Sequence, residues 1–112
     1  MAAGEVSYRS GDFPAAVASF DRAVRLRETS QAQAALGRAL SDAGRPGEAL
    51  AALRRATELD ASNGDAWLAL GEVQLTGGDS AGARASYERY LAVEPAGRHA
   101  EEVRAVLARL RP

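Results

Sequence analysis

Few side chains in this sequence have the chemistry that enzymes and metal sites require. The chain of 112 residues has no cysteine and one histidine, His99, and all 14 of its basic residues are arginine. A thiol nucleophile, a cysteine-based zinc site, a multi-histidine metal site and lysine-dependent chemistry are therefore excluded. We predict no catalytic residue, no cofactor and no metal site, and we expect that the protein is not an enzyme.

The remaining polar groups of catalytic type lie where they have a local structural role. Ser41 and Asp42 form one such pair, and Asp79 and Ser80 form another. Both pairs fall at predicted turns, where these side chains cap helices or stabilise the turn. His99 is expected to be an exposed surface residue. We therefore assign a catalytic role to none of these five residues.

The charge of the whole chain excludes a further class of partner. The 14 basic residues nearly balance 15 acidic ones and leave a formal net charge of −1, so no strong field attracts a polyanion. We expect no nucleic-acid partner. No apolar run is long enough to cross a membrane and no signal peptide is recognisable, which predicts no membrane insertion and a cytoplasmic location.

The elements that must position any functional side chain repeat along the sequence. The pairs Leu36-Gly37 and Leu70-Gly71 stand 34 residues apart. The residues that follow recur at the same interval, namely Ala49 and Ala83, Leu53 and Tyr87, Ala56 and Tyr90, and Leu59 and Val93. A period of this length is typical of helical repeats.

Helix start and stop signals repeat with the same period. Ser30 and Gln33 are spaced as a capping box, which predicts Ser30 as the N-cap of one helix. Pro46 suits the first turn of the next helix, and Asn63 opens the one after that. Extended over the whole chain, this pattern predicts seven helices and no strands.

These residues resemble the tetratricopeptide repeat family. In that family Trp and Leu-Gly lie in the first helix of each unit, Ala and an aromatic residue lie in the second, and Pro closes the unit. The residues at the family spacings are Trp67, Leu70, Gly71, Ala83, Tyr87 and Pro95. The resemblance implies an all-α fold, in which antiparallel helix pairs form a right-handed α-α superhelix of about seven helices.

We predict that residues 1–112 form a single domain of this kind. It consists of a truncated first repeat at about 1–28, a second at about 29–62, a third at about 63–96 and a capping helix at about 97–111. The apolar residues of the last helix, from Ala100 to Leu110, recur at helical spacing. They would cover apolar surface that the last repeat otherwise leaves in water.

The helix face opposite the core is predicted to carry any binding site. In the family this face lines a concave groove that holds peptide segments of other proteins. The residues expected on it are Tyr8, Arg9, Arg38, Asp42, Asp65, Leu68, Glu72 and Leu75. Three of them, Tyr8, Leu68 and Leu75, give the face an apolar centre, so the expected partner is a protein or peptide segment with an apolar anchor.

Some family members grip the C-terminal carboxylate of a partner with Lys, Arg and Asn side chains on this face. The matching positions here are Glu5, Ala35, Asp65 and Ala69. Two acidic groups repel a carboxylate and two alanines offer it no donor, so this mode of binding is not expected.

Two alternatives remain open at this point. In the first, Leu68 and Leu75 contact only neighbouring helices, and the charges near them form a solvated surface. In the second, the truncated first repeat leaves an exposed end that stacks on a second copy, or on further repeats of a longer protein. The function would then be structural, with self-association in place of groove binding.

Overall fold

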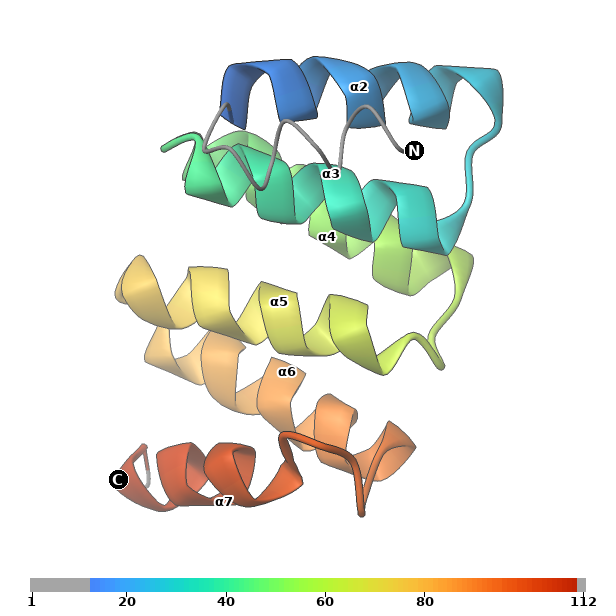
Figure 1. Ribbon diagram of the computed structural model, residues 1–112. Coiled ribbons are helices and arrows are strands. Elements are labelled where there is room, and N and C mark those ends of the chain that lie inside the picture. Colours follow the sequence, from blue (N-terminus) through green and yellow to red (C-terminus); the bar gives the residue numbers. More distant parts are fainter. Residues whose placement is uncertain (1–12, 111–112) are drawn as a thin grey trace.

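The computed structural model describes residues 13–110, which form six helices and no strand. The helices are α2 (Phe13–Leu26), α3 (Ser30–Asp42), α4 (Pro46–Leu59), α5 (Gly64–Thr76), α6 (Ser80–Val93) and α7 (Ala100–Arg109) (Figure 1). The predicted all-α fold is confirmed. The first of the seven predicted helices lies outside the described residues. None of the six helices is long and apolar enough to cross a membrane.

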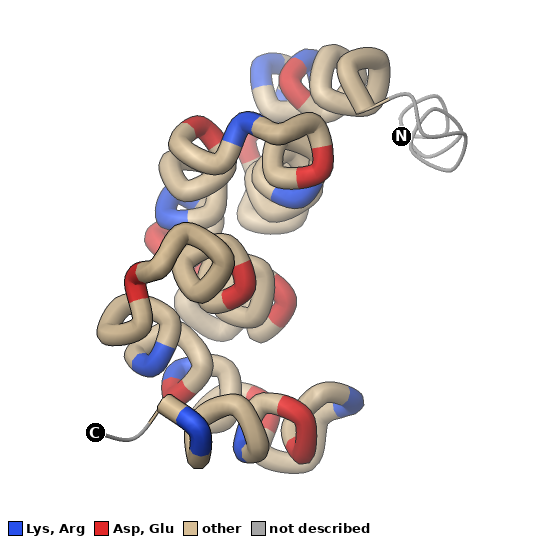
Figure 2. The backbone as a smooth tube through the Cα atoms, turned by 90° about the vertical axis from the view of Figure 1, so that its left-hand side faces the viewer, with Lys and Arg blue, Asp and Glu red and all other residues tan. Residues whose placement is uncertain are grey.

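The helices are stacked in chain order. α3 packs against α4 and α5 against α6, while contacts between α4 and α5 join the two pairs and α7 packs on α6. Figure 2, viewed nearly along the helix axes, shows them one above another in two columns. In the view of Figure 1, α3 and α5 lie in front of α4 and α6. The first helices of the two pairs therefore share one face of the molecule.

Two glycines end α3 and α5 in the same way, 34 residues apart. Gly44 and Gly78 have φ angles of 78° and 86°, a conformation that glycine adopts without steric cost. The next residue in each turn donates a backbone hydrogen bond five residues back, from Arg45 to Leu40 (2.8 Å) and from Asp79 to Gln74 (2.9 Å). This bonding is that of a Schellman turn. Two turns of the same geometry therefore follow α3 and α5 at equivalent positions of the 34-residue period.

The N-terminus of α3 differs from the prediction by one residue. Thr29 is the N-cap, with extended backbone angles, and its hydroxyl accepts a hydrogen bond from the Ala32 amide at 3.0 Å. Ser30, predicted as the cap, is the first helical residue. Its hydroxyl donates to the carbonyl of Ala56 at 2.7 Å and accepts from the Asn63 side-chain amide at 2.8 Å. Ser30 thus connects the starts of α3 and α5 to the end of α4.

The glycine of each Leu-Gly pair lies where two helices touch. A Cβ atom on Gly37 would be 2.6 Å from Cγ of Leu53, and one on Gly71 would be 2.7 Å from the ring of Tyr87. Both distances are shorter than side chains tolerate, so only glycine permits this approach. The repeated Leu-Gly pair therefore serves helix contact at both positions.

The last helix begins later than predicted. Residues 96–99 form turns, and α7 runs from Ala100 to Arg109. Tyr90, which occupies the place of Ala56 one period earlier, is buried, and its hydroxyl accepts a hydrogen bond from the His99 amide at 3.2 Å. Gly97 has no side chain to collide with this hydroxyl, which would lie 2.7 Å from a Cβ atom there. The large Tyr90 therefore holds the connection to α7.

Candidate functional site

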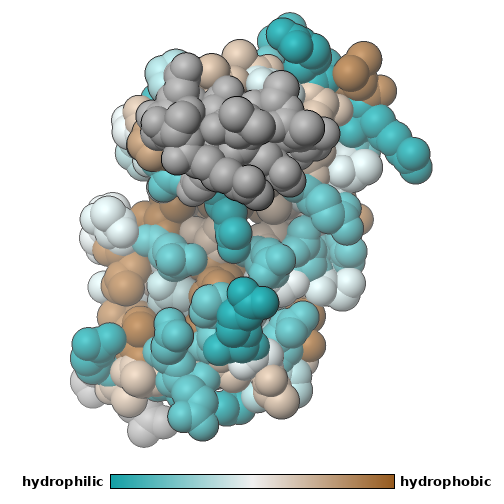
Figure 3. All heavy atoms as spheres, in the orientation of Figure 1, coloured by the Kyte–Doolittle hydropathy of each residue, from teal (hydrophilic) through white to brown (hydrophobic). Residues whose placement is uncertain are grey.

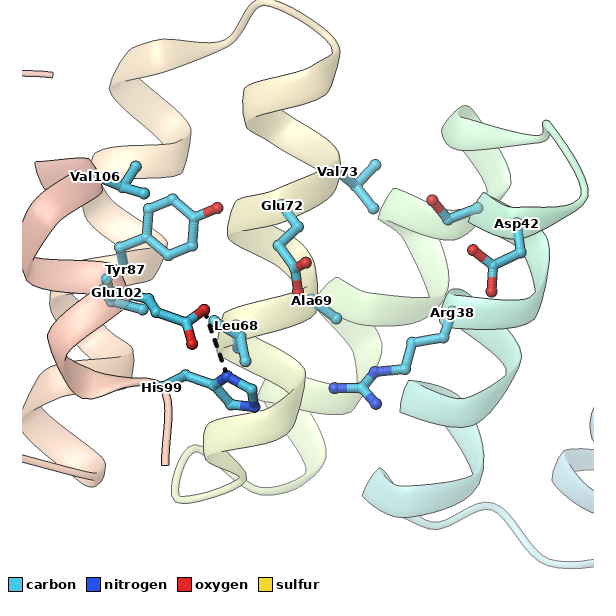
Figure 4. Close-up of a pocket in the computed structure, with 12 residues that line it drawn as sticks. Arg38, Asp42, Leu68, Ala69, Glu72, Val73, Tyr87, His99, Glu102 and Val106 are labelled. Atoms are coloured by element: carbon cyan, nitrogen blue, oxygen red, sulfur yellow. Dashed lines mark ion pairs between the residues drawn. The ribbon is translucent and has the colours of Figure 1, made fainter. Parts of the chain in front are cut away.

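A hollow of about 500 Å³ lies on the face shared by α3 and α5. α5 forms its floor, and α3 and α7 form its two sides (Figure 4). It is lined by Arg38, Ser41, Asp42, Leu68, Ala69, Glu72, Val73, Tyr87, His99, Glu102, Val103 and Val106. Figure 3 shows apolar surface between hydrophilic side chains at the level of α5. We call this hollow the concave groove.

Four of the residues proposed from the sequence line the concave groove together. They are Arg38 and Asp42 from α3 and Leu68 and Glu72 from α5. Their spacing along each helix places them on the same face, as the 100° periodicity predicts. Two others, Asp65 and Leu75, are not among the lining residues. Tyr8 and Arg9 lie outside the described residues, as does Glu5.

The two leucines expected at the apolar centre have different surroundings. Leu68 is only 7% exposed and packs in a core cluster with Tyr87 and Val103, so just a small part of it reaches the groove. Leu75 is half-buried against the same cluster, away from the groove. The apolar surface of the groove therefore also includes side chains from two further helices, namely Tyr87 from α6 and Val103 and Val106 from α7.

The sequence analysis missed the contribution of α7. Residues His99, Glu102, Val103 and Val106 form one side of the groove, although this helix was interpreted only as a cap. Leu107 and Leu110 of the same helix do not line the groove and pack against the core cluster that contains Tyr87 and Tyr90. The sequence holds no specific signal for this role, because acidic residues such as Glu101 and Glu102 are favoured in the first turn of any helix.

Two charged groups of the groove have no charged partner among residues 13–110. Arg38 and Glu72 make no side-chain hydrogen bond or ion pair with any described residue, and Figure 4 shows the Arg38 side chain extending from α3 toward α5. Glu102 lies 3.9 Å from Nδ1 of His99, at the limit of an ion pair and dependent on a protonated imidazole. These groups remain able to bind charges from outside the chain.

Tyr87 places a polar atom at the bottom of the groove. Its side chain is 3% exposed, yet its hydroxyl has no hydrogen-bond partner among residues 13–110. Burial, together with the nearby carboxylate of Glu72, raises the pKa of Tyr87, so the phenol keeps its proton at neutral pH. Figure 4 shows the hydroxyl pointing toward α5, the helix that carries Glu72.

A second hollow lies between α2 and α4, on the opposite face of α3. It has a volume of about 660 Å³ and includes Leu36 and Leu40, which point away from Arg38. Its three arginines are already paired within the chain, Arg25 with Asp21 (3.0 Å), Arg45 with Glu48 (2.6 Å) and Arg55 with Glu28 (3.0 Å). Because these charges are satisfied internally, the concave groove is the better candidate site.

No metal site competes with this assignment in the described part of the chain. Across residues 13–110, no three histidine or carboxylate side chains gather as metal ligands would. The mixture of apolar surface, unpaired charges and one phenol suits the binding of a peptide segment.

Solved structures with the same fold include several helical repeat domains. One is the TPR2B-domain:pHsp70 complex of yeast Sti1, with a TM-score of 0.89 and 19% identity over 96% of this chain and 90% of that one. The second TPR domain of human RPAP3, in complex with the HSP70 peptide SGPTIEEVD, gives a TM-score of 0.85 and 19% identity, with coverage of 97% and 89%.

A bacterial protein has the same architecture. The type III secretion chaperone SycD of Yersinia enterocolitica, in complex with a peptide of the translocator YopD, gives a TM-score of 0.87 and 18% identity. The similarity covers 96% of this chain and 86% of SycD. At these identities the structures establish a shared fold. A comparison with curated protein sequences finds no match.

The family itself is shown by sequence. The tetratricopeptide repeat model matches residues 1–41 and again 34–100, which together span most of the chain. The matched residues include both Leu-Gly pairs and the matching Gly44 and Gly78 turns. The chain therefore belongs to the tetratricopeptide repeat family.

Proposed function

We propose that this chain is a non-enzymatic protein-interaction module that binds a segment of a partner protein in the concave groove. The observation that carries the proposal is the set of unpaired groups there: Arg38, Glu72 and the Tyr87 hydroxyl surround an apolar floor. Polar groups that a fold leaves unsatisfied in a hollow are available to a ligand. By contrast, the arginines of the hollow between α2 and α4 are compensated within the chain.

The solved structures support this proposal by analogy. The Sti1 and RPAP3 domains are in complex with pHsp70 and with an HSP70 peptide, and SycD with a peptide of YopD. In each case a repeat domain of this fold holds a segment of another protein. The peptide bound by RPAP3 ends in Glu-Glu-Val-Asp. We do not expect an acidic tail of this kind here, because Ala69 and the exposed Asp65 stand where a clamp requires cations.

A charge-reversal variant of the groove tests the proposal. Arg38→Glu with Glu72→Arg reverses the polarity of the groove but keeps the net charge of the chain, and both side chains are exposed. The matched control is Arg22→Glu with Glu88→Arg, two residues outside both hollows. Circular dichroism should show the same helix content for both variants.

Affinity capture from the source cells, quantified by mass spectrometry, then compares the two variants with the wild-type protein. We expect at least one partner to be lost from the groove variant and retained by the control. Equal capture by all three proteins would contradict binding in the groove.

Self-association is the second candidate function. It is favoured by Leu26 at the end of α2, which is 81% exposed, more than any other large apolar side chain in residues 13–110. Stacking of α2 on a second copy would bury it. Sedimentation at increasing protein concentration should then show a dimer that Leu26→Glu dissociates. A monomer at every concentration would contradict this candidate.

A further inference from the structure

We propose that the partner segment carries a lysine or arginine side chain that enters the concave groove between Glu72 and Glu102 and reaches the hydroxyl of Tyr87. This inference rests on the proposed function and specifies the chemistry of the ligand. Three properties of the groove support it: an unpartnered phenol at its floor, an excess of carboxylates and an apolar wall of suitable length.

The first property is the Tyr87 hydroxyl. A tyrosine that is only 3% exposed normally hydrogen-bonds within the protein, because an unmade bond there costs free energy. Gly71 allows the ring to approach α5, since any side chain there would collide with it. Among residues 13–110, Arg84 Nε is the one side-chain polar atom that is fully buried and has no partner. The Tyr87 oxygen, which also has no partner, is therefore not fully buried. The hydroxyl is therefore an acceptor that faces an open site.

The second property is the charge of the lining. Glu72 and Glu102 contribute two carboxylates, against one guanidinium from Arg38. His99 adds a positive charge only when it is protonated. A cation in the groove is therefore favoured, and an anion is repelled everywhere except beside Arg38. Because Glu72 and Glu102 come from different helices, a side chain between them is attracted from both α5 and α7.

The third property is the wall that leads to these carboxylates. Leu68, Val103 and Val106 line the groove, and Figure 4 shows Val106 beside the Tyr87 ring. Lysine and arginine have long aliphatic stems that pack on apolar surface while the charged head reaches polar groups. A short polar side chain lacks this stem, and a purely apolar one leaves the Tyr87 hydroxyl unpaired. A long basic side chain satisfies all three properties.

Selection from a random peptide library tests the inference without requiring the identity of the partner. A phage-displayed library of 12-residue peptides is selected on the wild-type protein, and binders that fail to bind the Arg38→Glu, Glu72→Arg variant are kept as groove binders. We expect lysine or arginine to be enriched at one position next to an apolar residue. Groove binders without this enrichment would overturn the inference and leave the proposed function intact. Failure to obtain any groove binder would contradict both.

Synthetic peptides then locate the basic residue. For the best binder, replacement of the basic residue by norleucine, which keeps the stem and removes the charge, should weaken binding about fivefold in fluorescence anisotropy. The Glu72→Gln, Glu102→Gln variant should bind the two peptides almost equally. The matched control, Glu88→Gln with Glu101→Gln, makes the same charge change outside the groove and should keep the fivefold preference. If the Glu72→Gln, Glu102→Gln variant keeps the fivefold preference for the basic peptide over the norleucine peptide, these two carboxylates do not bind the basic residue.

The contribution of the phenol is measured separately. Tyr87→Phe removes one oxygen and keeps the ring against Gly71, so the fold is retained. It should weaken the basic peptide several-fold and leave the norleucine peptide unchanged. Equal weakening of both peptides would indicate a change in the shape of the groove, and it would contradict a direct contact with the basic group.

Discussion

Gly71 is the position where helix packing and the shape of the concave groove depend on each other. Replacement by alanine places a Cβ atom 2.7 Å from Cε1 and 2.8 Å from Cδ1 of Tyr87. The ring cannot easily move away, because Tyr87 is 3% exposed and packed among buried side chains. Inserting a methyl group into such a contact costs about 1–3 kcal/mol, whereas alanine in place of glycine in a helix contributes about 1 kcal/mol.

The expected balance for Gly71→Ala is a loss of up to about 2 kcal/mol in the free energy of unfolding, measured by urea denaturation. For a domain of this size, that loss lowers Tm by up to about 10 °C. Gly47→Ala is the matched control, because Gly47 is helical and exposed with no atom within 4 Å of the added Cβ. It should stabilise the protein by up to about 1 kcal/mol. A Gly71→Ala protein as stable as Gly47→Ala would refute the packing argument.

Three further predictions concern single contacts. The pKa of Glu28 is lowered to about 2, mainly by a hydrogen bond from Arg55. The carboxylate therefore stabilises the fold above about pH 4.5, and this contribution is lost as the pH falls to about 2. In calorimetry, the difference in Tm between the wild-type protein and Glu28→Gln should be positive at pH 7 and vanish near pH 2; a constant difference would contradict the pairing. Asn63→Ala removes a helix cap and the bond to Ser30, so urea unfolding should show a loss of about 1–2 kcal/mol. Asn63→Asp keeps the cap and removes only the donor to Ser30, so it should lose less than Asn63→Ala; an Asn63→Asp protein as stable as the wild type would argue against the bond to Ser30. Tyr90→Phe removes the acceptor for the His99 amide, which should exchange its hydrogen faster by NMR while amides in the middle of α6 are unaffected. Unchanged exchange at His99 would show that the hydroxyl does not hold this turn.

Much of the fold could be predicted from the sequence because the packing positions repeat. The 34-residue period identified the glycines that allow close helix contact and the turns that end α3 and α5. The N-cap at Thr29 was missed because Thr29 and Ser30 are both good caps. What distinguishes them is a tertiary hydrogen bond from Ser30 to Ala56, which local sequence does not reveal.

The candidate site was less predictable, for physical reasons. Helical periodicity states which residues share a face, and it correctly grouped Arg38 with Asp42 and Leu68 with Glu72. It does not state which neighbouring helix covers that face. The groove side of α7 depends on the angle at which the helix leaves α6, which is held by the contact between Tyr90 and His99. For the same reason Leu75 was placed in the groove, although it packs against the core cluster.

We propose that the concave groove, and not the hollow between α2 and α4, receives the partner segment. Chemical-shift mapping distinguishes the two hollows, with ¹⁵N-labelled protein titrated with a groove-binding peptide from the library or with a segment of a captured partner. We expect the largest amide shifts at Leu68, Glu72, Val103 and Val106, and small shifts at Ala18 and Ala51 in the other hollow. Shifts concentrated at Ala18 and Ala51, with the groove unchanged, would contradict it.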